Sequence, residues 1–443
     1  TVEDAYGYSK FARVALKTND IDFRARPHSD EESSFLTSIA LGLTATYKDI
    51  DKADQLVLLG FEPEEESPIV FLRAYKQVRK RGLKVISDAP FASRGAAKLS
   101  AELIGDISAI SGLTAKSVIL VGERLAEKIG ALSAAVKLAE TSGAKLAWIP
   151  RRAGERGALQ AGAISTLLPG GRPVSDPSAR VDVAAAWSVD SLPSEAGRST
   201  SEILLALSVK NLDAVVIGGV DPLDISNTAL SQLLNSFVVS LEITHSAVTA
   251  IADVVLPVAA VIEKSGSFQD WQGSPRSFEK AVTDSLARSD VKILSALADE
   301  MGSPINLPTV SATAREIAAL GNWDGAVSKF ESVLPEKLEV ATDKLQLSSW
   351  RLLLDLGTLQ DGEANLAGTA RKAAAHISSN QAKKLGVTVG DQIAISSDFG
   401  SLKLPVEICE MSDSAIWVPR NSINSQVIAN LGFTSGLVTV AKA

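Results

Sequence analysis

The chain has 443 residues, of which 46% are hydrophobic and 22% charged, so it is predicted to be globular and to form two or three domains. Its formal net charge of −8 at pH 7 excludes a broad electrostatic attraction to nucleic acid or to an anionic membrane surface. The single cysteine, Cys409, excludes a disulfide framework within the chain, a four-thiolate zinc site and a cysteine-ligated iron–sulfur cluster made by this chain alone.

In the first half of the chain, short apolar runs alternate with helical patterns, which indicates parallel βαβ construction. The run at 55–60 is predicted as a strand, and the run at 84–88 as the next strand. Between them the pattern predicts a helix over 67–82. Ser67 is expected as its N-cap and Gly82 at its end, since these residue types favour the two helix termini.

The same pattern recurs further along the chain, at 117–122, 125–143 and 145–149, then at 213–219, 224–235 and 237–242, with another apolar run at 252–260. We therefore predict two open parallel sheets or one large doubly wound sheet. Two sub-domains would span about 45–150 and 205–300. A long connection over 151–204, rich in Gly, Pro and Arg, would join them.

The sequence changes in character toward the C-terminus. A helix is predicted over 288–302, and short alternating strands separated by turns follow, at 391–409, 415–419 and 436–443. We therefore predict an α/β region over 1–340 and a small β-barrel over 341–443.

Two further classes of feature are missing from the sequence. Charges and glycines interrupt every long apolar run, so no direct membrane insertion is predicted. The three histidines, His28, His245 and His376, lie far apart without metal-ligand spacing, and no GxSxG motif is present, so neither a metal site nor a serine hydrolase is predicted. The first stretch, TVEDAYGYSK, lacks an initiator methionine and the order of a signal peptide, so we expect part of a longer protein.

Open α/β sheets bind ligands beyond the carboxyl ends of their strands, so the strand-to-loop junctions are the candidate sites. Three junctions stand out, GFEPEEES at 60–67, SDAPFAS at 87–93 and GGVDPLD at 218–224. Each offers backbone N–H groups near a helix start, but no GxGxxG or GxxxxGK[ST] motif is present. Glu62 and Asp221 stand where a phosphate would bind, so helix capping is favoured over nucleotide binding.

The connection after residue 150 carries arginines next to glycines, namely Arg151, Arg152, Arg156 and Arg172. They could form an anion-binding nest, or they could fix an irregular loop by charge-assisted bonds to carbonyls and carboxylates. We favour the second interpretation. Cys409 ends a predicted strand and is interpreted as a thiol of the barrel core.

Several stretches together resemble one family, among them LVLLGFEPEEESPIVFLR (56–73), WIPRRAGERGAL (148–159), VIGGVDPLD (216–224) and ADVVLPVAAVIEKSGSFQDWQGSPRSF (252–278). They resemble the C-terminal part of the large iron–sulfur subunit, known as the G subunit, of bacterial NADH:quinone oxidoreductase, respiratory complex I, in its actinobacterial form. The resemblance covers nearly the whole chain. It implies the molybdopterin-oxidoreductase fold, α/β with open parallel doubly wound sheets, followed by a small β-barrel similar to a molybdopterin-dinucleotide-binding domain.

The chain departs from active members of that superfamily at the junctions. Where those enzymes have Gly-x-Asn-Pro, this chain has GFEP and GVDP, and where they have Asp-Pro-Arg it has DAPF, with Phe91 at the arginine position. Two added carboxylates and one lost cation disfavour a bound pyrophosphate by on the order of a few kcal/mol. The resemblance therefore implies a vestigial pocket, whose candidate residues are Gly60, Glu62, Asp88, Gly219, Asp221, Glu263, Gly266 and Asn421.

The resemblance implies a structural segment of the complex I peripheral arm, in a complex that transfers electrons from NADH to quinone. No cofactor, catalytic residue or metal ligand is expected in this chain, and iron–sulfur clusters are expected upstream of it. The implied partners are other peripheral-arm subunits, without nucleic acid, on the cytoplasmic side of the bacterial inner membrane. Two alternatives stay open: an active molybdopterin-dependent oxidoreductase such as a formate dehydrogenase, and a free-standing interaction module.

The stretch 261–278 switches abruptly from an apolar run to glycine, serine and aromatic residues. In active relatives the corresponding turn belongs to a scaffold that closes over the pterin. We predict that Trp271 and Phe268 are largely buried under the sheets, with Gly266 and Gly273 permitting backbone conformations that a side chain would hinder.

Overall fold

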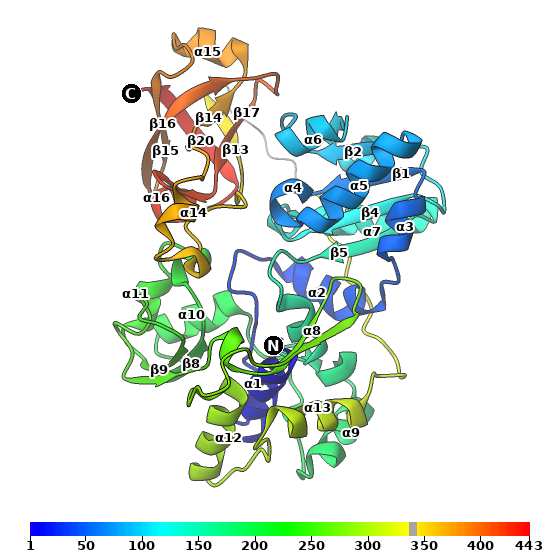
Figure 1. Cartoon of the computed structure of the whole chain (residues 1–443), viewed down its shortest axis with the longest axis vertical. Coiled ribbons are helices and arrows are strands. Elements are labelled where there is room, and N and C mark those ends of the chain that lie inside the picture. Colours follow the sequence, from blue (N-terminus) through cyan, green and yellow to red (C-terminus); the bar gives the residue numbers. More distant parts are fainter. Residues whose placement is uncertain (336–342) are drawn as a thin grey trace. The chain divides into compact units, whose positions relative to one another are not determined.

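The computed structural model describes residues 1–335 and 343–443 (Figure 1). The chain divides into two compact units. Unit 1 contains Thr1–Arg26, Glu32–Gly42 and Arg152–Glu331, and unit 2 contains Pro27–Glu31, Leu43–Arg151 and Ser332–Ala443. The segment of the predicted barrel therefore shares a compact unit with the first predicted sub-domain. This grouping differs from a division of the chain at residue 340.

Unit 2 contains a five-stranded parallel sheet with the order β3-β2-β1-β4-β5. Its strands are β1 (Gln55–Leu59), β2 (Lys84–Asp88), β3 (Glu102–Ile104), β4 (Val118–Gly122) and β5 (Lys145–Ile149). The helices of this region are α3 (Tyr47–Lys52), α4 (Pro63–Glu66), α5 (Pro68–Arg81), α6 (Arg94–Lys98), η2 (Ile107–Ala109), η3 (Glu123–Glu127) and α7 (Ala131–Ser142). Strands β1 and β4 are almost entirely buried, as expected for a parallel sheet covered on both faces.

The predicted strands and the helix over 67–82 are confirmed. Helix α5 begins with Pro68 and ends at Gly82, whose left-handed φ of 66° lets its N–H bond back to the carbonyls of Gln77 and Val78. The helix predicted over 125–143 starts later, at Ala131. The preceding residues form the 3₁₀ turn η3, and Gly130 with φ of 79° interrupts the helical backbone before α7.

The predicted barrel is present, and it is closed by six strands in the order β13-β17-β14-β16-β15-β20. These are β13 (Lys344–Trp350), β14 (Ala375–Ile377), β15 (Gln392–Ser397), β16 (Gly400–Ile408), β17 (Ala415–Pro419) and β20 (Gly436–Lys442). Its core is aliphatic, with Leu347, Ile377, Ile393, Leu404 and Val418 fully or almost fully buried. Around it lie η7 (Thr358–Gln360), α14 (Ala364–Ala367), α15 (Ser379–Leu385), β18 (Asn421–Ser422), β19 (Ser425–Gln426) and α16 (Val427–Leu431).

Helix α1 (Val2–Val14) is central to unit 1, where it contacts α8, α12, α13 and β11. Gly7 allows its close approach to α12, because a Cβ at that position would lie 2.8 Å from Cγ2 of Val291. On the same helix Tyr6 is fully buried, accepts a hydrogen bond from Nε1 of Trp187 at 2.7 Å and donates one to Glu316 at 2.8 Å. A buried aromatic pair with satisfied polar atoms thus anchors the helix.

The predicted connection over 151–204 has secondary structure of its own. It contains α8 (Glu155–Gln160), β6 (Leu167–Leu168), η4 (Pro169–Gly171), β7 (Arg172–Pro173) and α9 (Pro177–Trp187). Before this connection lie α2 (Asp30–Ser38) and η1 (Ala40–Gly42). After the second sheet follow η6 (Val261–Glu263), β11 (Gly266–Gln269), β12 (Pro275–Phe278), α12 (Asp290–Glu300) and α13 (Val310–Leu320).

The second parallel sheet, in unit 1, has three strands in the order β10-β9-β8. These are β8 (Ala214–Gly218), β9 (Phe237–Glu242) and β10 (Val254–Pro257). Helix α10 (Thr200–Ser208) precedes β8, and η5 (Pro222–Asp224) and α11 (Ala229–Leu233) lie between β8 and β9. Helices α10 and α11 lie beside β8 and β9 (Figure 1). The described part of the chain therefore forms two open parallel sheets, one of the two arrangements that the sequence predicts.

Candidate functional site

The order of the five-stranded sheet reverses between β1 and β4, the position at which open α/β sheets bind ligands. The loops that follow these two strands approach each other closely. Gly60 has a φ of +56°, and a Cβ placed on it would lie 2.5 Å from the backbone nitrogen of Leu125. A Cβ on Gly122 would lie 2.4 Å from the carbonyl oxygen of Gly60. Backbone atoms therefore fill the space directly beyond β1 and β4.

Glu62 follows β1 and is only 4% exposed. Its carboxylate caps α4, accepting a hydrogen bond from the backbone nitrogen of Glu64 at 3.3 Å and another from the hydroxyl of Ser93. Burial raises the pKa of Glu62 to about 7, against the opposing effect of the Ser93 hydrogen bond. A carboxyl group thus occupies the helix start at which a phosphate oxygen would accept hydrogen bonds.

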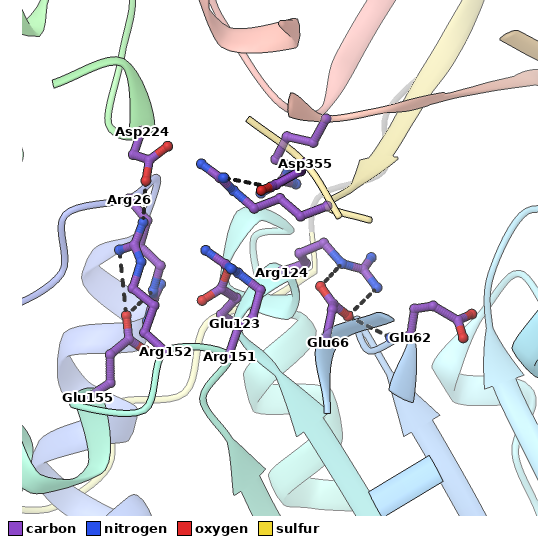
Figure 2. A network of polar contacts seen from close by, with 12 residues as sticks. Arg26, Glu62, Glu66, Glu123, Arg124, Arg151, Arg152, Glu155, Asp224 and Asp355 are labelled. Carbon is purple, nitrogen blue, oxygen red and sulfur yellow. Dashed lines mark hydrogen bonds and ion pairs between the residues drawn. The ribbon is translucent and has the colours of Figure 1, made fainter. Parts of the chain in front are cut away.

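Glu66 and Arg124 form a buried ion pair between the two loops (Figure 2). Arg124 donates from Nε at 2.9 Å and from Nη2 at 3.0 Å to the two carboxylate oxygens of Glu66. The backbone nitrogen of Glu62 donates to the same carboxylate at 2.6 Å. The Arg124 guanidinium also lies over the ring of Trp350, 5.2 Å from its centroid. Sequence-distant side chains therefore close this part of the sheet.

Phe91 lies in a group of rings that we call the aromatic cluster, made of Phe91, Trp350, Trp417 and His376. The Phe91 ring centroid is 5.5 Å from that of Trp350 and 5.4 Å from that of Trp417. Phe91 is 5% exposed, and its three partners belong to barrel strands β13, β17 and β14. The residue at the arginine position of the active enzymes is here an apolar contact between the five-stranded sheet region and the barrel.

Burial shifts the pKa values of two titratable groups beside the aromatic cluster, His376 and Cys409. Burial lowers the pKa of His376, although Glu407, 3.3 Å from its Nε2, opposes that shift. Burial also raises the pKa of the Cys409 thiol to about 11, so little thiolate is present near neutral pH. Cys409 packs against the aromatic cluster, so its prediction as part of the barrel core is wrong. Asp88, which ends β2, pairs with Lys128 at 2.8 Å.

The loop after β8 repeats the capping arrangement in unit 1. Gly219 has a φ of +61°, which glycine adopts without steric cost. Asp221 caps η5 by accepting a hydrogen bond from the backbone nitrogen of Leu223 at 3.0 Å. Asp224 in the same turn pairs with Arg152 at 2.9 Å (Figure 2). Carboxylates thus cap the starts of short helices at both the first and the third junction.

Glu263 has a local structural role in the stretch 261–278. Its carboxylate accepts hydrogen bonds from the backbone nitrogen of Ala260 at 2.9 Å and from the hydroxyl of Ser285 at 2.8 Å. These bonds, the first above all, lower the pKa of Glu263. Gly266 begins β11, where a Cβ would lie 2.8 Å from Cγ2 of Thr1.

The aromatic residues of this stretch are less buried than predicted. Trp271 and Phe268 are only half-buried, so the prediction of their burial under the sheets is wrong. The stretch forms the hairpin β11–β12, in which Phe268 stacks on Phe278 with ring centroids 5.4 Å apart. Gly273, with φ of +84°, lies in the hairpin turn, where a side chain would be strained.

The eight candidate residues fall into two groups. Gly60, Glu62 and Asp88 lie at the carboxyl ends of the neighbouring strands β1 and β2, and Asn421, in β18, belongs to the same unit. The carbonyl of Asn421 accepts a hydrogen bond from the backbone nitrogen of Leu356 at 2.8 Å. The others, Gly219, Asp221, Glu263 and Gly266, belong to unit 1.

Arg151, Arg152 and Arg172 have the structural role that the sequence favoured, whereas Arg156 donates to the side chain of Gln160 in its own helix α8 at 3.4 Å. Arg151 pairs with Glu123 at 3.2 Å, and Arg152 donates to the carbonyl of Ala25 at 2.8 Å. Arg172 pairs with Asp182 at 2.6 Å and also donates to the carbonyls of Pro169, Leu320 and Gly321. Their guanidinium groups are thus engaged in fixing irregular backbone.

The residues that complete these networks, chiefly Ser93, Arg124, Trp350 and Trp417, were not predicted from the sequence. A buried group of charges in unit 1 was not predicted either. Arg26 pairs there with Glu32 at 2.8 Å. It also pairs with Glu155 at 3.1 Å (Figure 2). The stretch DFRAR, with two arginines that are at most 3% exposed, is its signal in the sequence.

Two kinds of feature are absent from the described residues, 1–335 and 343–443. No group of three or more His, Cys, Asp or Glu side chains among them has the geometry to hold a metal ion. No helix in the same part of the chain combines the length and the apolar character that crossing a membrane requires.

Comparison with known proteins gives consistent results. A model of the molybdopterin oxidoreductase family matches residues 1–300. The chain is 47% identical to the G subunit of the NADH-quinone oxidoreductase of Mycobacterium tuberculosis, over 99% of this chain and 57% of that protein. It is 43% identical to the G subunit of the Streptomyces coelicolor enzyme, over 100% of this chain and 58% of that protein. The chain thus spans less than two thirds of the length of either relative.

A similar fold occurs among solved structures. Acetylene hydratase from Pelobacter acetylenicus superposes with a TM-score of 0.52, covering 93% of this chain and 80% of the hydratase. The two sequences are 14% identical, so this likeness concerns the fold alone.

Proposed function

Because the chain belongs to the molybdopterin oxidoreductase family, we propose that it is a cofactor-free structural segment of the large peripheral-arm subunit of an NADH-quinone oxidoreductase. The similarity to the G subunits of such enzymes extends over essentially the whole chain. The complete enzyme would transfer electrons from NADH to quinone, and this segment would take part by its structure.

The observation that carries the cofactor-free part of the proposal is the filled switch point between β1 and β4. The residues there do not fit a pterin dinucleotide. Glu62 caps α4, and the Glu66–Arg124 pair bridges the loops. A Cβ atom placed on Gly60 would clash with the backbone of the neighbouring loop. Binding a pyrophosphate would require breaking these contacts and would place its charge next to buried carboxyl groups.

The third junction supports the same conclusion independently. Asp221 holds the backbone nitrogen of Leu223 at the start of η5, and Asp224 neutralises Arg152. A phosphate at this loop would have to displace the carboxylate of Asp221 from its own helix cap. Both acids that replace the family's asparagines therefore serve as capping residues.

The first experiment measures ligand binding and metal content of the purified 443-residue chain. We expect no saturable calorimetric binding of GDP or of a molybdopterin guanine dinucleotide at millimolar ligand. We also expect no stoichiometric molybdenum, tungsten or iron by elemental analysis. Micromolar binding of the dinucleotide, or about one metal per chain, would instead support an active molybdopterin enzyme.

A double variant tests the role of the two acids directly. Glu62→Asn with Asp221→Asn removes two carboxylates and restores the residue type of the active enzymes at both junctions. We expect weak nucleotide binding at most, since the backbone contacts around Gly60 persist, and no turnover. The matched control is Glu64→Asn with Asp224→Asn, which removes acids from the same turns without changing the caps.

The assembly part of the proposal has its own test. We propose that the segment contacts other peripheral-arm subunits on the cytoplasmic side of the bacterial inner membrane. The tagged chain, mixed with the remaining peripheral-arm subunits of the Mycobacterium tuberculosis enzyme, should form a complex that survives gel filtration. Failure with every subunit, while the chain stays folded, would favour a free-standing interaction module.

A further inference from the structure

Strand β8 forms one edge of the three-stranded sheet, and no described strand pairs with its outer side. Four of its five residues, from Val215 to Gly218, are only half-buried, and Ala214 is exposed. Parallel sheets are normally covered on both faces, and open edges invite pairing with another chain segment. The outer edge of β8 can thus accept a further strand.

The orientation of the peptide groups along β8 follows from two hydrogen bonds to β9. The carbonyl of Asp213 accepts from Phe237, and the backbone nitrogen of Gly219 donates to the carbonyl of Leu241. Peptide groups alternate in direction along a strand, so residues 213, 215, 217 and 219 face β9. The N–H and C=O groups of Ala214, Val216 and Gly218 therefore face away from the sheet.

A cavity of about 560 Å³ runs along this edge, and all five residues of β8 line it. The opposite wall comes from helix α1 and from the segment 18–25, with Phe11, Leu16 and Ile21 among the lining residues. Leu16 is 42% exposed, so the cavity reaches solvent. Its volume lies within the range of about 300 to 1,000 Å³ that binding pockets occupy.

The ionisable side chains around the cavity already have partners. Asp20 pairs with Arg198 at 2.6 Å, Asp22 pairs with Arg24 at 2.7 Å, and the Tyr8 hydroxyl donates to Asp290 at 3.1 Å. The other lining residues are mostly Ala, Val, Ile, Leu and Phe. The cavity is therefore suited to apolar side chains, while the exposed backbone of β8 supplies its hydrogen-bonding groups.

We propose that this cavity binds an extended, predominantly apolar peptide segment, which adds as a strand to the outer edge of β8. A small apolar molecule would fill the space but leave the outward N–H and C=O groups of Ala214, Val216 and Gly218 without partners, at a cost in desolvation. An extended segment satisfies them and places alternate side chains into the cavity. The proposal does not depend on assembly with other complex I subunits.

The source of such a segment can be searched directly. The chain matches 57% of the length of the G subunit of the Mycobacterium tuberculosis enzyme, so the remainder of that relative provides a defined set of sequences. Overlapping synthetic peptides covering that remainder would be added one at a time to the 443-residue chain. Binding would be read by amide hydrogen exchange at single-residue resolution.

In the chain alone, the amides of Val216 and Gly218 should exchange faster than those of Val215 and Ile217, which face β9. A peptide added at about ten times its Kd should slow exchange at Val216 and Gly218 about tenfold. If no peptide does so, or if a bound peptide protects other residues and leaves these two unchanged, the proposal is wrong. Binding of a small apolar dye in the cavity, without any peptide effect, would assign the cavity to small molecules and overturn the proposal.

A matched pair of variants tests the location. Ala214 is exposed and lines the cavity, so Ala214→Trp should block the edge and weaken peptide binding at least about tenfold, as a filled pocket loses its contacts. Val255→Trp places the same side chain on β10, at the opposite edge of the sheet, and should leave binding unchanged. If Ala214→Trp misfolds by circular dichroism, Leu16→Glu at the cavity mouth replaces it. Equal binding by the blocked variant and the control would contradict the proposal.

Discussion

The two parallel sheets of this chain differ in how the space around them is used. In the five-stranded sheet, β1 and β4 are almost entirely buried, and the loops beyond them are closed by Glu62, Glu66 and Arg124. In the three-stranded sheet, β8 and β10 are partly exposed, and a cavity follows one edge. At the corresponding loops, however, both sheets use a carboxylate to cap the following helix.

Capping by an acid and closure of the surroundings are separate properties in these two sheets. Capping by an acid occurs in a closed, desolvated setting at Glu62 and in a more open one at Asp221, so this use of a carboxylate does not require burial. The loops beyond β1 and β4 are closed by side-chain contacts, whereas the three-stranded sheet has a cavity and outward-facing backbone groups along β8. We therefore expect large stability effects in the first sheet and binding effects in the second.

The largest effect is expected from Arg124→Ala. Its guanidinium is 11% exposed and neutralises Glu66, which is 4% exposed, so removal leaves a buried carboxylate beside Glu62. Breaking a buried pair in this way should cost about 3 to 5 kcal/mol in the free energy of unfolding. Urea unfolding followed by tryptophan fluorescence measures it. The control, Arg94→Ala, breaks a surface pair and should cost less than about 1 kcal/mol; equal losses would contradict the distinction.

A loss of about 3 to 4 kcal/mol is expected from Phe91→Ala, because the substitution empties the centre of the aromatic cluster. Thermal unfolding and denaturant titration should agree on this value. Phe399, 63% exposed, provides the matched Phe→Ala change, with an expected loss below about 1 kcal/mol. A small effect at Phe91 would mean that the cluster contributes little to joining the sheet region and the barrel.

The buried carboxyl of Glu62 predicts a pH dependence of smaller size. Since burial raises the pKa of Glu62 to about 7, the folded state binds this proton more tightly than the unfolded state does. The stability that the folded chain gains from this proton is present below about pH 4. As the pH rises toward 7, the free energy of unfolding falls by on the order of 2 to 3 kcal/mol. Glu62→Gln should remove this loss and make the chain more stable than the unmodified one at pH 8.

The pKa of His376 is also shifted, so the effect of Glu62 is measured as a difference between the variant and the unmodified chain. Burial lowers its pKa, so its contribution has the opposite sign and falls as the pH drops. The informative quantity is the difference in unfolding free energy between the Glu62→Gln variant and the unmodified chain, measured at each pH from 5 to 8. A difference that stays constant over this range would contradict a raised pKa, and the exposed Glu102→Gln change serves as control.

The smallest effect is expected in the open sheet. Val255 in β10 is 42% exposed, so Val255→Ala removes little buried surface and should cost less than about 1 kcal/mol. Leu58→Ala in β1, at 1% exposure, should cost about 2 to 5 kcal/mol. Similar losses in the two strands, measured by denaturant unfolding, would mean that the open sheet is covered in solution.

The parallel strands could be predicted from the sequence because each is a short, nearly continuous apolar run between turn signals. The run at 84–88 and the helix ending at Gly82 are examples, since their signals are local. The late start of α7 could not be foreseen from apolar spacing, because it depends on the positive φ of Gly130. Trp271 was misplaced because its hairpin lies on a partly exposed surface rather than beneath a sheet.

In the candidate site, too, local features could be predicted from the sequence, whereas long-range contacts could not. Sequence comparison with active enzymes identified Glu62, Asp221 and Phe91 as changed positions, and local pattern predicted the caps. The partners of these residues, Ser93 for Glu62 and Trp350 and Trp417 for Phe91, come from segments about 30 or more than 250 residues away. No periodicity or spacing within a single sequence indicates such pairs, so the closed character of the site became visible only in the fold.

The geometry of two barrel tryptophans has an optical consequence. The rings of Trp350 and Trp417 have centroids 4.8 Å apart and are tilted by 48°, on strands β13 and β17 that pair directly. Indole transitions at this distance and angle couple, so the far-ultraviolet circular dichroism of the folded chain should contain a signed exciton couplet. That couplet would disappear when β13 separates from β17. The barrel thus carries an intrinsic spectroscopic signature by which its unfolding can be followed separately from that of the rest of the chain.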